Sequence, residues 1–417
     1  MKRIDLLILL LVLVQPLQRL HAQDQPLTMD TILSRIARRH PELLGYEQRA
    51  EALRAGAGGA RAWMAPMAGL GTFMTPYPGQ RIMEESEKGS VMFSVEQNIP
   101  NRSKLAASGR YLGARADSET LRRASRWNLL RSEARVACYR WNLAAERHKN
   151  LATLERTGQL MLEVARVRIS HNQEQPAAVY KAESRLAEIR NMMDMEQVTM
   201  DESRAQLAAL MGLPAGAPFL LDSTMRPSVP LFAAETDTAT LASSRSDIRL
   251  IDQEIRLMRL NRELQQQQAK PDFRIRFDHM QPIGKMPAQF TAMAMVSIPI
   301  APWSAPMYRS EVASMDHQIT AMELERSAML LENRGMLDRM RIQLTGMQKQ
   351  LERFERSILP SLQKNYATVR AAWEENREPL PMVLDALEAL AMSHQEYLNK
   401  KESFYLMITE YEKLAEQ

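Results

Sequence analysis

Residues 272–280 read Asp-Phe-Arg-Ile-Arg-Phe-Asp-His-Met, a run in which apolar and charged side chains alternate. Successive side chains of a β-strand point to opposite sides. One face of this run therefore carries Phe273, Ile275 and Phe277, and the other carries Arg274, Arg276 and Asp278. Alternation over about ten residues is typical of a half-buried sheet, and equally of a strand in a membrane barrel.

Three other runs have a similar character, at about 67–75, 88–99 and 289–300. The apolar faces of the last two carry Val91, Phe93 and Val95, and Phe290, Ala292, Ala294, Val296 and Ile298. Their opposite faces carry Ser90, Met92, Ser94 and Glu96, and Thr291, Met293, Met295 and Ser297. The run 67–75 is rich in glycine, and its two faces are ambiguous.

Four strands cannot close a barrel by themselves, because the smallest membrane barrels have about eight. Four strands from each of three chains would make about twelve, which is within the range of known barrels. An open sheet with two apolar edges is an aggregation hazard, and closure by oligomerisation removes that hazard. A soluble sheet that packs on helices is the alternative that the pattern leaves open.

The strands belong to a plan that occurs twice in the chain. Pro41 leads through a helical stretch to Pro66, and Ser246 leads through a stretch of the same length to Pro271, an offset of 205 residues. Toward the end of each half, five heptad-spaced apolar positions recur with an offset of 204 residues. They are Val179, Leu186, Met193, Met200 and Leu207, and then Val383, Leu390, Tyr397, Phe404 and Tyr411.

Strict heptads predict left-handed coiled-coil packing. Residues 102–170 and 307–359 contain no proline, so each predicts a very long helix, and these helices turn back near Pro176 and near the pair Pro379 and Pro381. The expected fold is mainly α with a small β part. It consists of long helical hairpins at about 102–213 and 305–416 and β-hairpins at about 67–99 and 272–300.

Residues 1–22 have the pattern of a secretory signal peptide, with a charged start, an apolar run of nine residues and Ala22 before the expected cut. The apolar run is too short to span a bilayer as a helix. No cysteine follows the cut, so a lipid-anchored end is not expected. The predicted organisation is a signal peptide at 1–22, a first repeat at 23–213, a linker at 214–239 and a second repeat at 240–417.

Composition argues against several classes of function. Lys and Arg number 54 against 50 Asp and Glu, so the concentrated basic charge that nucleic acids require is not expected. The seven histidines never lie within four residues of one another, and the single cysteine cannot form a cluster, so no local zinc motif occurs. No nucleophile elbow or phosphate loop occurs either. We therefore expect no enzyme, no catalytic residues and no cofactor.

Among the 29 methionines, two classes stand out. Met193, Met200, Met315, Met322, Met329 and Met336 occupy heptad positions, where a flexible apolar side chain fills a helix–helix seam. Met92, Met293 and Met295 instead lie on the polar faces of predicted strands. Because thioethers are soft ligands that suit Cu(I), these three suggest export of copper or silver. The alternative is a lineage that substitutes methionine for leucine freely.

Several short segments mark corresponding points in the two halves. The two halves begin with His40-Pro41-Glu42-Leu43 and with Arg245-Ser246-Asp247-Ile248. The strand pairs are followed by Gln97-Asn98-Ile99-Pro100 and by Ile298-Pro299-Ile300. The helical turns are followed by Ala178-Val179-Tyr180-Lys181-Ala182-Glu183 and by Val383-Leu384-Asp385-Ala386. With the signal peptide and the duplicated plan, these segments resemble the outer-membrane efflux proteins, the TolC-like outer membrane factors. His40 stands where the family usually has Asn, and Ser246 where Pro is usual.

The resemblance implies a homotrimer with a twelve-stranded barrel surrounded by outer-membrane lipid and a helical tunnel that crosses the periplasm. Such proteins are passive exit ducts, and a periplasmic adaptor and an inner-membrane pump such as an RND transporter work with them. The lumen of the barrel would be faced by Glu96, Arg274, Arg276 and Asp278. The adaptor-docking tips would be Ser170, His171, Asn172, Gln173 and Glu174 in the first half and Glu375, Asn376, Arg377 and Glu378 in the second.

Two other classes of protein remain as alternatives. A periplasmic adaptor is also a helical-hairpin protein, but it would have one long hairpin beside a lipoyl-like β domain rather than a duplicated plan. A secreted coiled-coil structural or adhesive protein would leave the amphipathic strands at 272–300 unexplained.

Overall fold

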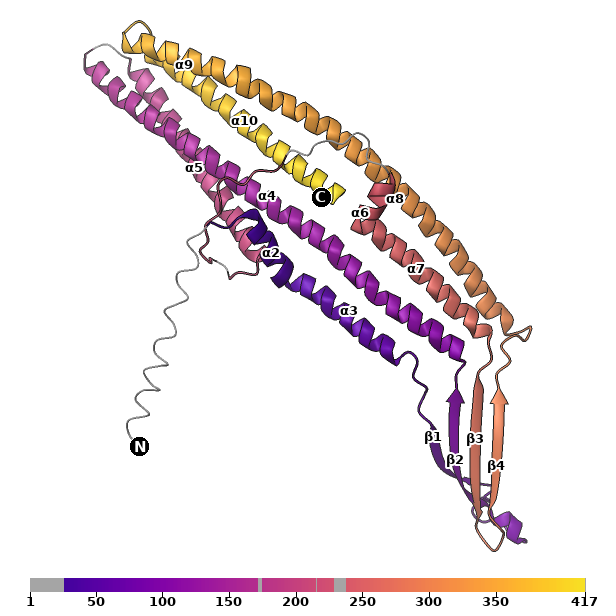
Figure 1. Ribbon diagram of the computed structural model, residues 1–417. Coiled ribbons are helices and arrows are strands. Elements are labelled where there is room, and N and C mark those ends of the chain that lie inside the picture. Colours follow the sequence, from indigo (N-terminus) through magenta and orange to yellow (C-terminus); the bar gives the residue numbers. More distant parts are fainter. Residues whose placement is uncertain (1–25, 172–174, 215, 229–237, 417) are drawn as a thin grey trace, which may run out of the picture. The chain divides into compact units, whose positions relative to one another are not determined.

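A computed structural model describes residues 26–171, 175–214, 216–228 and 238–416. The predicted signal peptide at 1–22 lies outside these residues. The described chain is mainly α-helical with one four-stranded antiparallel sheet, which confirms the predicted fold class. The helices are α2 (Met29–Arg39), α3 (Pro41–Gly59), α4 (Arg102–Ser170), α5 (Pro176–Leu210), α6 (Thr238–Ser244), α7 (Ser246–Gln266), α8 (Ala305–Arg353), α9 (Leu359–Glu374) and α10 (Leu380–Ala415) (Figure 1).

Prolines set the limits of the long helices. Helix α4 runs for 69 residues between Pro100 and the turn before Pro176. Helix α5 begins at Pro176, and Pro379 is the N-cap residue of α10. Proline is favoured at the start of a helix, because its fixed φ suits a helix and the N–H that it lacks would have no intrahelical partner there.

A π-helical segment, Phe354–Ile358, joins α8 to α9. The N–H of Leu359 donates to the carbonyl of Phe354, five residues earlier, instead of four. Pro360 follows at once and has no N–H for the carbonyl of Arg356, and its ring would clash with that carbonyl in a regular helix. The wider π-helical turn accommodates Pro360, which is the first proline after Pro306, so the regular helix is interrupted at this position.

The chain divides into two compact units, which are described separately. The first takes residues up to Leu44, Ser125–Arg245 and the chain from Leu331 onward, and the second takes Gly45–Ala124 and Ser246–Leu330. Each unit draws segments from both sequence repeats.

The first unit has two apolar cores. One core is built around Ile32, Ile36, Leu130 and Leu207. The other lies near the N-terminal ends of α5 and α10 and is built around heptad residues of these two helices. Most of the ten heptad positions predicted to recur with an offset of 204 are buried: Val179, Leu186, Leu207, Val383, Leu390, Phe404 and Tyr411. The coiled-coil prediction is confirmed at these positions.

A buried arginine also joins three helices of the first unit. Arg147 on α4 is 5% exposed, and its Nη2 donates to Oε2 of Glu402 on α10 at 2.6 Å. Its Nη1 lies 3.7 Å from Oε2 of Glu196 on α5. Burial raises the pKa of Glu196, although Arg147 acts in the opposite direction. The two carboxylates therefore share one buried guanidinium, which supplies most of their compensation.

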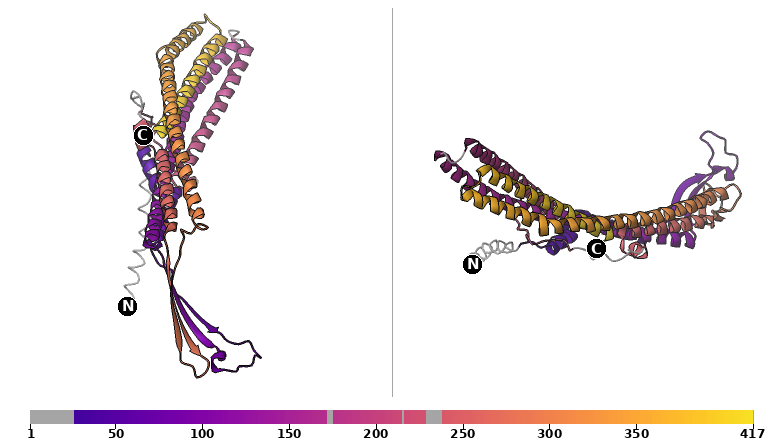
Figure 2. Two further views of the ribbon diagram at one scale, coloured as in Figure 1. Left: turned by 90° about the vertical axis from the view of Figure 1, so that its right-hand side faces the viewer. Right: turned by 90° about the horizontal axis from the view of Figure 1, so that it is seen from above.

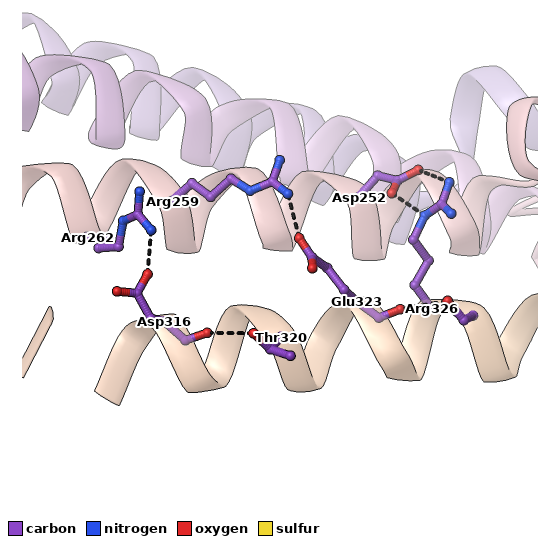
Figure 3. A network of polar contacts seen from close by, with 8 residues as sticks. Asp252, Arg259, Arg262, Asp316, Thr320, Glu323 and Arg326 are labelled. Atoms are coloured by element: carbon purple, nitrogen blue, oxygen red, sulfur yellow. Dashed lines mark hydrogen bonds and ion pairs between the residues drawn. The ribbon is translucent and has the colours of Figure 1, made fainter. Parts of the chain in front are cut away.

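In the second unit, α7 packs antiparallel to α8. Ile251, Ile255 and Ile319 form a small core against which Met322 and Met329 pack, as the heptad pattern predicted for these methionines. Three ion pairs flank this core: Asp252 with Arg326, Arg259 with Glu323, and Arg262 with Asp316 (Figure 3). The apolar seam and its charged border thus fix the register of the two helices.

The sheet also belongs to the second unit and has the order β1-β2-β3-β4. Its strands are β1 (Met67–Phe73), β2 (Ser90–Ile99), β3 (Phe273–Pro282) and β4 (Gln289–Val296), and all neighbours are antiparallel. β4 ends before Pro299, which cannot donate a hydrogen bond, rather than continuing to about residue 300. The central pair, β2 and β3, joins the two halves of the sequence.

Candidate functional site

One side of the sheet is predominantly apolar on all four strands. The pairing sets Val95 of β2 level with Phe277 of β3 and Ala68 of β1, and it sets Phe93 level with Leu70 of β1. The same side also carries four polar residues, Thr72, Gln97, His279 and Gln281. We call this side the apolar face; its members include Ala68, Leu70, Val91, Phe93, Val95, Ile99, Phe273, Ile275, Phe277, Phe290, Ala292, Ala294 and Val296. The rings of Phe277 and Phe290 stack on this face with centroids 5.8 Å apart.

The opposite side, the polar face, brings together every strand residue predicted to face a lumen. Glu96, Arg274, Arg276 and Asp278 all lie on it, as do Met92, Met293 and Met295. Its other members include Ser90, Ser94, Asn98, Met280, Gln289 and Thr291. Met280 was not among the predicted residues, although the alternation of β3, continued two residues past Asp278, would have indicated it.

In a water-soluble sheet the polar side chains are the exposed ones, whereas here several apolar side chains are more exposed than the charged ones. On the apolar face, Leu70 is 79% exposed and Phe290 is 70% exposed, whereas Asp278 on the polar face is 5% exposed. None of the described helices of this unit covers either face (Figure 2). The soluble alternative, a sheet packed on helices, therefore lacks its covering layer among the described residues. An exposed apolar face of this extent needs another cover.

The charges of the polar face neutralise one another. Nη1 of Arg274 lies 3.2 Å from Oε1 of Glu96, and its Nε donates to Oδ1 of Asn98 at 2.8 Å. Nε of Arg276 donates to Oδ1 of Asp278 at 2.9 Å. Two arginines and two carboxylates thus leave the face without net charge, and a polar surface of this kind suits contact with water rather than selection of one ion by charge.

The strand ends that adjoin the helices are held by Asp272. Its carboxylate accepts from Nζ of Lys104 at 2.6 Å and from the backbone N–H of Asn101 at 2.9 Å. Its backbone N–H donates to Oγ of Ser297 at 2.8 Å. A cleft of about 510 Å³ lies here, lined in part by Asn98, Arg274 and Met295 of the polar face.

The ends of α4 and α9 lie side by side in the first unit, as Figures 1 and 2 show. Nη1 and Nη2 of Arg168 each donate to the backbone carbonyl of Trp373 at 3.2 Å, and the guanidinium carbon lies 4.4 Å from the centroid of the indole ring. This contact was not predicted. The repeat offset of 205 residues, which relates position 168 to position 373, is the signal that could have indicated it.

The predicted docking residues lie next to this contact. Ser170 ends α4, His171 follows it, and both are exposed. Asn172, Gln173 and Glu174 lie outside the described residues. Glu375, Asn376, Arg377 and Glu378 form the exposed turn between α9 and α10. Asn376 has a φ of 61°, and its N–H donates to the carbonyl of Trp373 at 3.0 Å, so it ends α9 as asparagine often does.

The described residues lack two further features. They contain no cluster of three or more His, Cys, Asp or Glu side chains that could hold a metal ion. No helix among them is both long and apolar enough to cross a membrane.

No protein-family model and no curated protein sequence matches the chain. Solved structures do match. The outer-membrane channel OprN superposes with a TM-score of 0.75 at 12% identity, over 93% of this chain and 89% of that chain. The structure of CusC, a protein described as forming a transmembrane channel, superposes with a TM-score of 0.76 at 13% identity, over 93% of this chain and 91% of that chain. For the open state of the MtrE outer membrane channel of Neisseria gonorrhoeae the TM-score is 0.72 at 12% identity, over 93% and 88%. The chain therefore has the fold of these outer-membrane channels, the fold that the resemblance in its sequence implied.

Proposed function

We propose that this protein is the subunit of a passive exit channel in the outer membrane, part of a tripartite efflux system and not an enzyme. The observation that carries the proposal is the inverted sheet, whose apolar face is exposed while its charged residues lie on the more shielded face. Lipid is the solvent that suits such a face, and water-filled membrane barrels have this arrangement of apolar residues outside and polar residues inside.

The length of the strands supports the same proposal. β3 has ten residues, and at about 3.3 Å per residue it spans about 33 Å. A strand in a membrane barrel is tilted by about 40°, which reduces this span to a height of about 25 Å, the height of the apolar band of such barrels.

The edges of the sheet suit closure between copies of the chain. Among the described strands, β1 and β4 each pair on one side only. Because three antiparallel steps separate them, β1 and β4 run in opposite directions, so β4 of one copy can pair antiparallel with β1 of the next. We propose three copies and twelve strands, as the family resemblance implies, with Glu96, Arg274, Arg276 and Asp278 facing the lumen.

The exposed turns at the ends of α4 and α9 are the proposed docking sites for a periplasmic adaptor, through which an inner-membrane pump would deliver substrate. The candidate residues are Ser170, His171, Glu375, Asn376, Arg377 and Glu378, together with the three residues 172–174. The rival assignments are less well supported, because a periplasmic adaptor or a secreted coiled-coil protein gives no reason for an uncovered apolar sheet face.

Membrane fractionation combined with unheated gel electrophoresis tests the proposal. The expected result is a heat-sensitive trimer in the outer-membrane fraction. A soluble periplasmic monomer would overturn the proposal. Phe277→Asp and Phe290→Asp should prevent assembly, because a charge on the lipid-facing side of a barrel is costly. The control is Met295→Asp on the polar face, which should not prevent assembly because the new carboxylate lies opposite Arg274.

We further propose that soft metal ions, copper or silver, are among the exported substrates. The alignment of methionines on the polar face supports this choice. Replacing Met92, Met293 and Met295 with leucine should impair copper tolerance more than tolerance to organic toxins. Equal effects on both kinds of tolerance would remove the proposal.

A further inference from the structure

The register of the central strand pair places Met92 of β2 directly opposite Met280 of β3 on the polar face. Directly opposite residues of an antiparallel pair have Cα atoms about 4.5–5.5 Å apart, so two methionine side chains at these positions can bring their sulfur atoms to one ion. Both side chains are partly shielded. This juxtaposition joins the two halves of the sequence, 188 residues apart, and Met280 belongs to no heptad seam.

The charges nearby separate this pair from the other methionines of the polar face. Met293 is directly opposite Arg276, and Met295 is directly opposite Arg274, so each has a guanidinium as its immediate cross-strand neighbour. A cation bound there would meet like charge. The neighbours of Met92 and Met280 carry no positive charge: Gly71 and Gln289 lie level with them, and Ser90, Ser94, Pro282 and Asp278 are next along the strands.

We propose that Met92 and Met280 form a binding site for a soft monovalent cation, Cu(I) or Ag(I), with two thioether ligands. The thioether sulfur is a soft, uncharged ligand that selects such ions over hard cations. The carboxylate of Asp278 lies between Met280 and Arg276 along β3 and is paired with Arg276, so the nearest charge along that strand is a compensated carboxylate and not a free cation. Two neutral ligands give weak, rapidly exchanging binding, which a site on an exit path requires, since conduction needs an ion to leave as readily as it enters.

This inference rests on the proposed exit channel and names a substrate class for its polar face. It also revises the set of soft-metal contacts predicted from the sequence, because it keeps Met92, adds Met280 and leaves out Met293 and Met295. The site can be examined on the purified full chain without a pump or an adaptor.

The experiment is a titration of the detergent-purified protein, labelled with [¹³C-methyl]methionine, with silver nitrate in chloride-free buffer. Silver(I) is diamagnetic, so the methyl resonances of ligating methionines shift and remain visible. We expect saturable shifts at the resonances of Met92 and Met280, and loss of the shift at the remaining methionine in Met92→Leu and in Met280→Leu. Matched variants Met293→Leu and Met295→Leu should keep both shifts. Leucine conserves volume, so all four variants should fold.

Shifts confined to other methionines, or retained in both Met92→Leu and Met280→Leu, would overturn the site. An unheated gel of each sample keeps the two proposals apart. A heat-sensitive trimer without the shifts would refute only the metal site, whereas the absence of a trimer would refute the channel.

Discussion

Lys181 and Asp385 occupy equivalent positions in the two halves of the sequence, 204 residues apart, and their side chains form an ion pair, with Nζ and Oδ1 separated by 2.5 Å. Helices α5 and α10 begin at positions with the same offset, Pro176 and Leu380, and they run in the same direction (Figure 1). The ion pair therefore brings equivalent residues side by side. Val179 and Val383 are buried in one core beneath this pair. The duplication is therefore expressed as direct contact between the copies.

The Lys181–Asp385 pair should add little to stability. Both side chains are about half exposed, 46% and 55%, and an exposed ion pair contributes about 0–1 kcal/mol because solvent screens it. A double-mutant cycle of Lys181→Ala and Asp385→Ala, measured by thermal unfolding at one protein concentration, should give a coupling within that range. A coupling of several kcal/mol would mean that this surface is buried in the assembly.

Arg147 should behave differently, because it is buried. Arg147→Met removes the buried guanidinium that Glu402 and Glu196 share, so Glu402 keeps only the longer contact with Arg140, and the free energy of unfolding should fall by about 3–5 kcal/mol. Adding Glu402→Met and Glu196→Met should recover part of this loss, since no uncompensated charge then remains. Arg140 is the matched control: it approaches the same Glu402 at 3.7 Å from an exposed position, so Arg140→Met should have a small effect. Equal losses in the two single variants would contradict this explanation.

Glu412 should make stability depend on pH. It pairs with Arg135 at 2.5 Å, and burial raises its pKa above the ordinary value of 4.5, while Arg135 and Arg131 lower it in part. A carboxyl with a raised folded-state pKa stabilises the fold most when protonated, so its contribution is present below pH 4.5 and is lost as the pH rises through the folded-state pKa.

Glu412→Gln removes this contribution. When the pH is lowered from neutral to pH 4.5, the melting temperature of the unmodified chain should therefore rise relative to that of the variant. Glu196→Gln should act in the same direction, because burial also raises the pKa of Glu196. Parallel pH profiles of the unmodified chain and both variants would show that neither carboxyl is responsible.

Pro360 should account for the π-helical segment at 354–358. Pro360→Ala restores an N–H and removes the clash with the preceding turn, so the helix can continue regularly. Because proline inside a helix costs about 3 kcal/mol, the variant should be more stable by up to about that amount, measured by thermal unfolding followed by circular dichroism. Alanine at the neighbouring exposed Gln363 serves as a control. A less stable Pro360→Ala protein would show that the π segment is itself needed for packing.

The edges of the sheet should cross-link between copies. Leu70 of β1 lies on the apolar face, as do Phe290, Ala292 and Ala294 of β4. With the buried Cys138 replaced by Ala, Leu70→Cys combined with cysteine at one of these β4 positions should give disulfide-linked oligomers, since same-face positions recur along a paired strand. Leu70→Cys with Met293→Cys, on opposite faces, should not. If every same-face pair stayed monomeric, the proposed closure would be wrong.

Periodic features of the sequence predicted most of the fold. The alternation in 273–278 assigned both faces of β3, and heptads assigned buried positions such as Val383 and Phe404. The glycine-rich run at 67–75 could not be assigned to faces by itself, because glycine has no side chain to alternate. Its pairing with β2 supplies the assignment, with Leu70 opposite Phe93.

Contacts between distant segments could not be predicted in the same way. Met92 lies opposite Met280 only because of the β2–β3 register, which is a property of two strands from different halves. The contact of Arg168 with Trp373 likewise cannot be read from local periodicity, and only the 205-residue offset between the repeats relates the two positions. Local periodicity determines which side of an element is apolar, whereas register between elements depends on the packing of the whole unit.

The two single-sided edges, β1 and β4, have a genetic consequence. In a ring closed through them, each copy completes its neighbours, so a chain damaged at one edge spoils assemblies that also contain intact chains. Alleles that break β1 or β4 should therefore be dominant over the normal gene, whereas alleles that prevent export of the chain should be recessive.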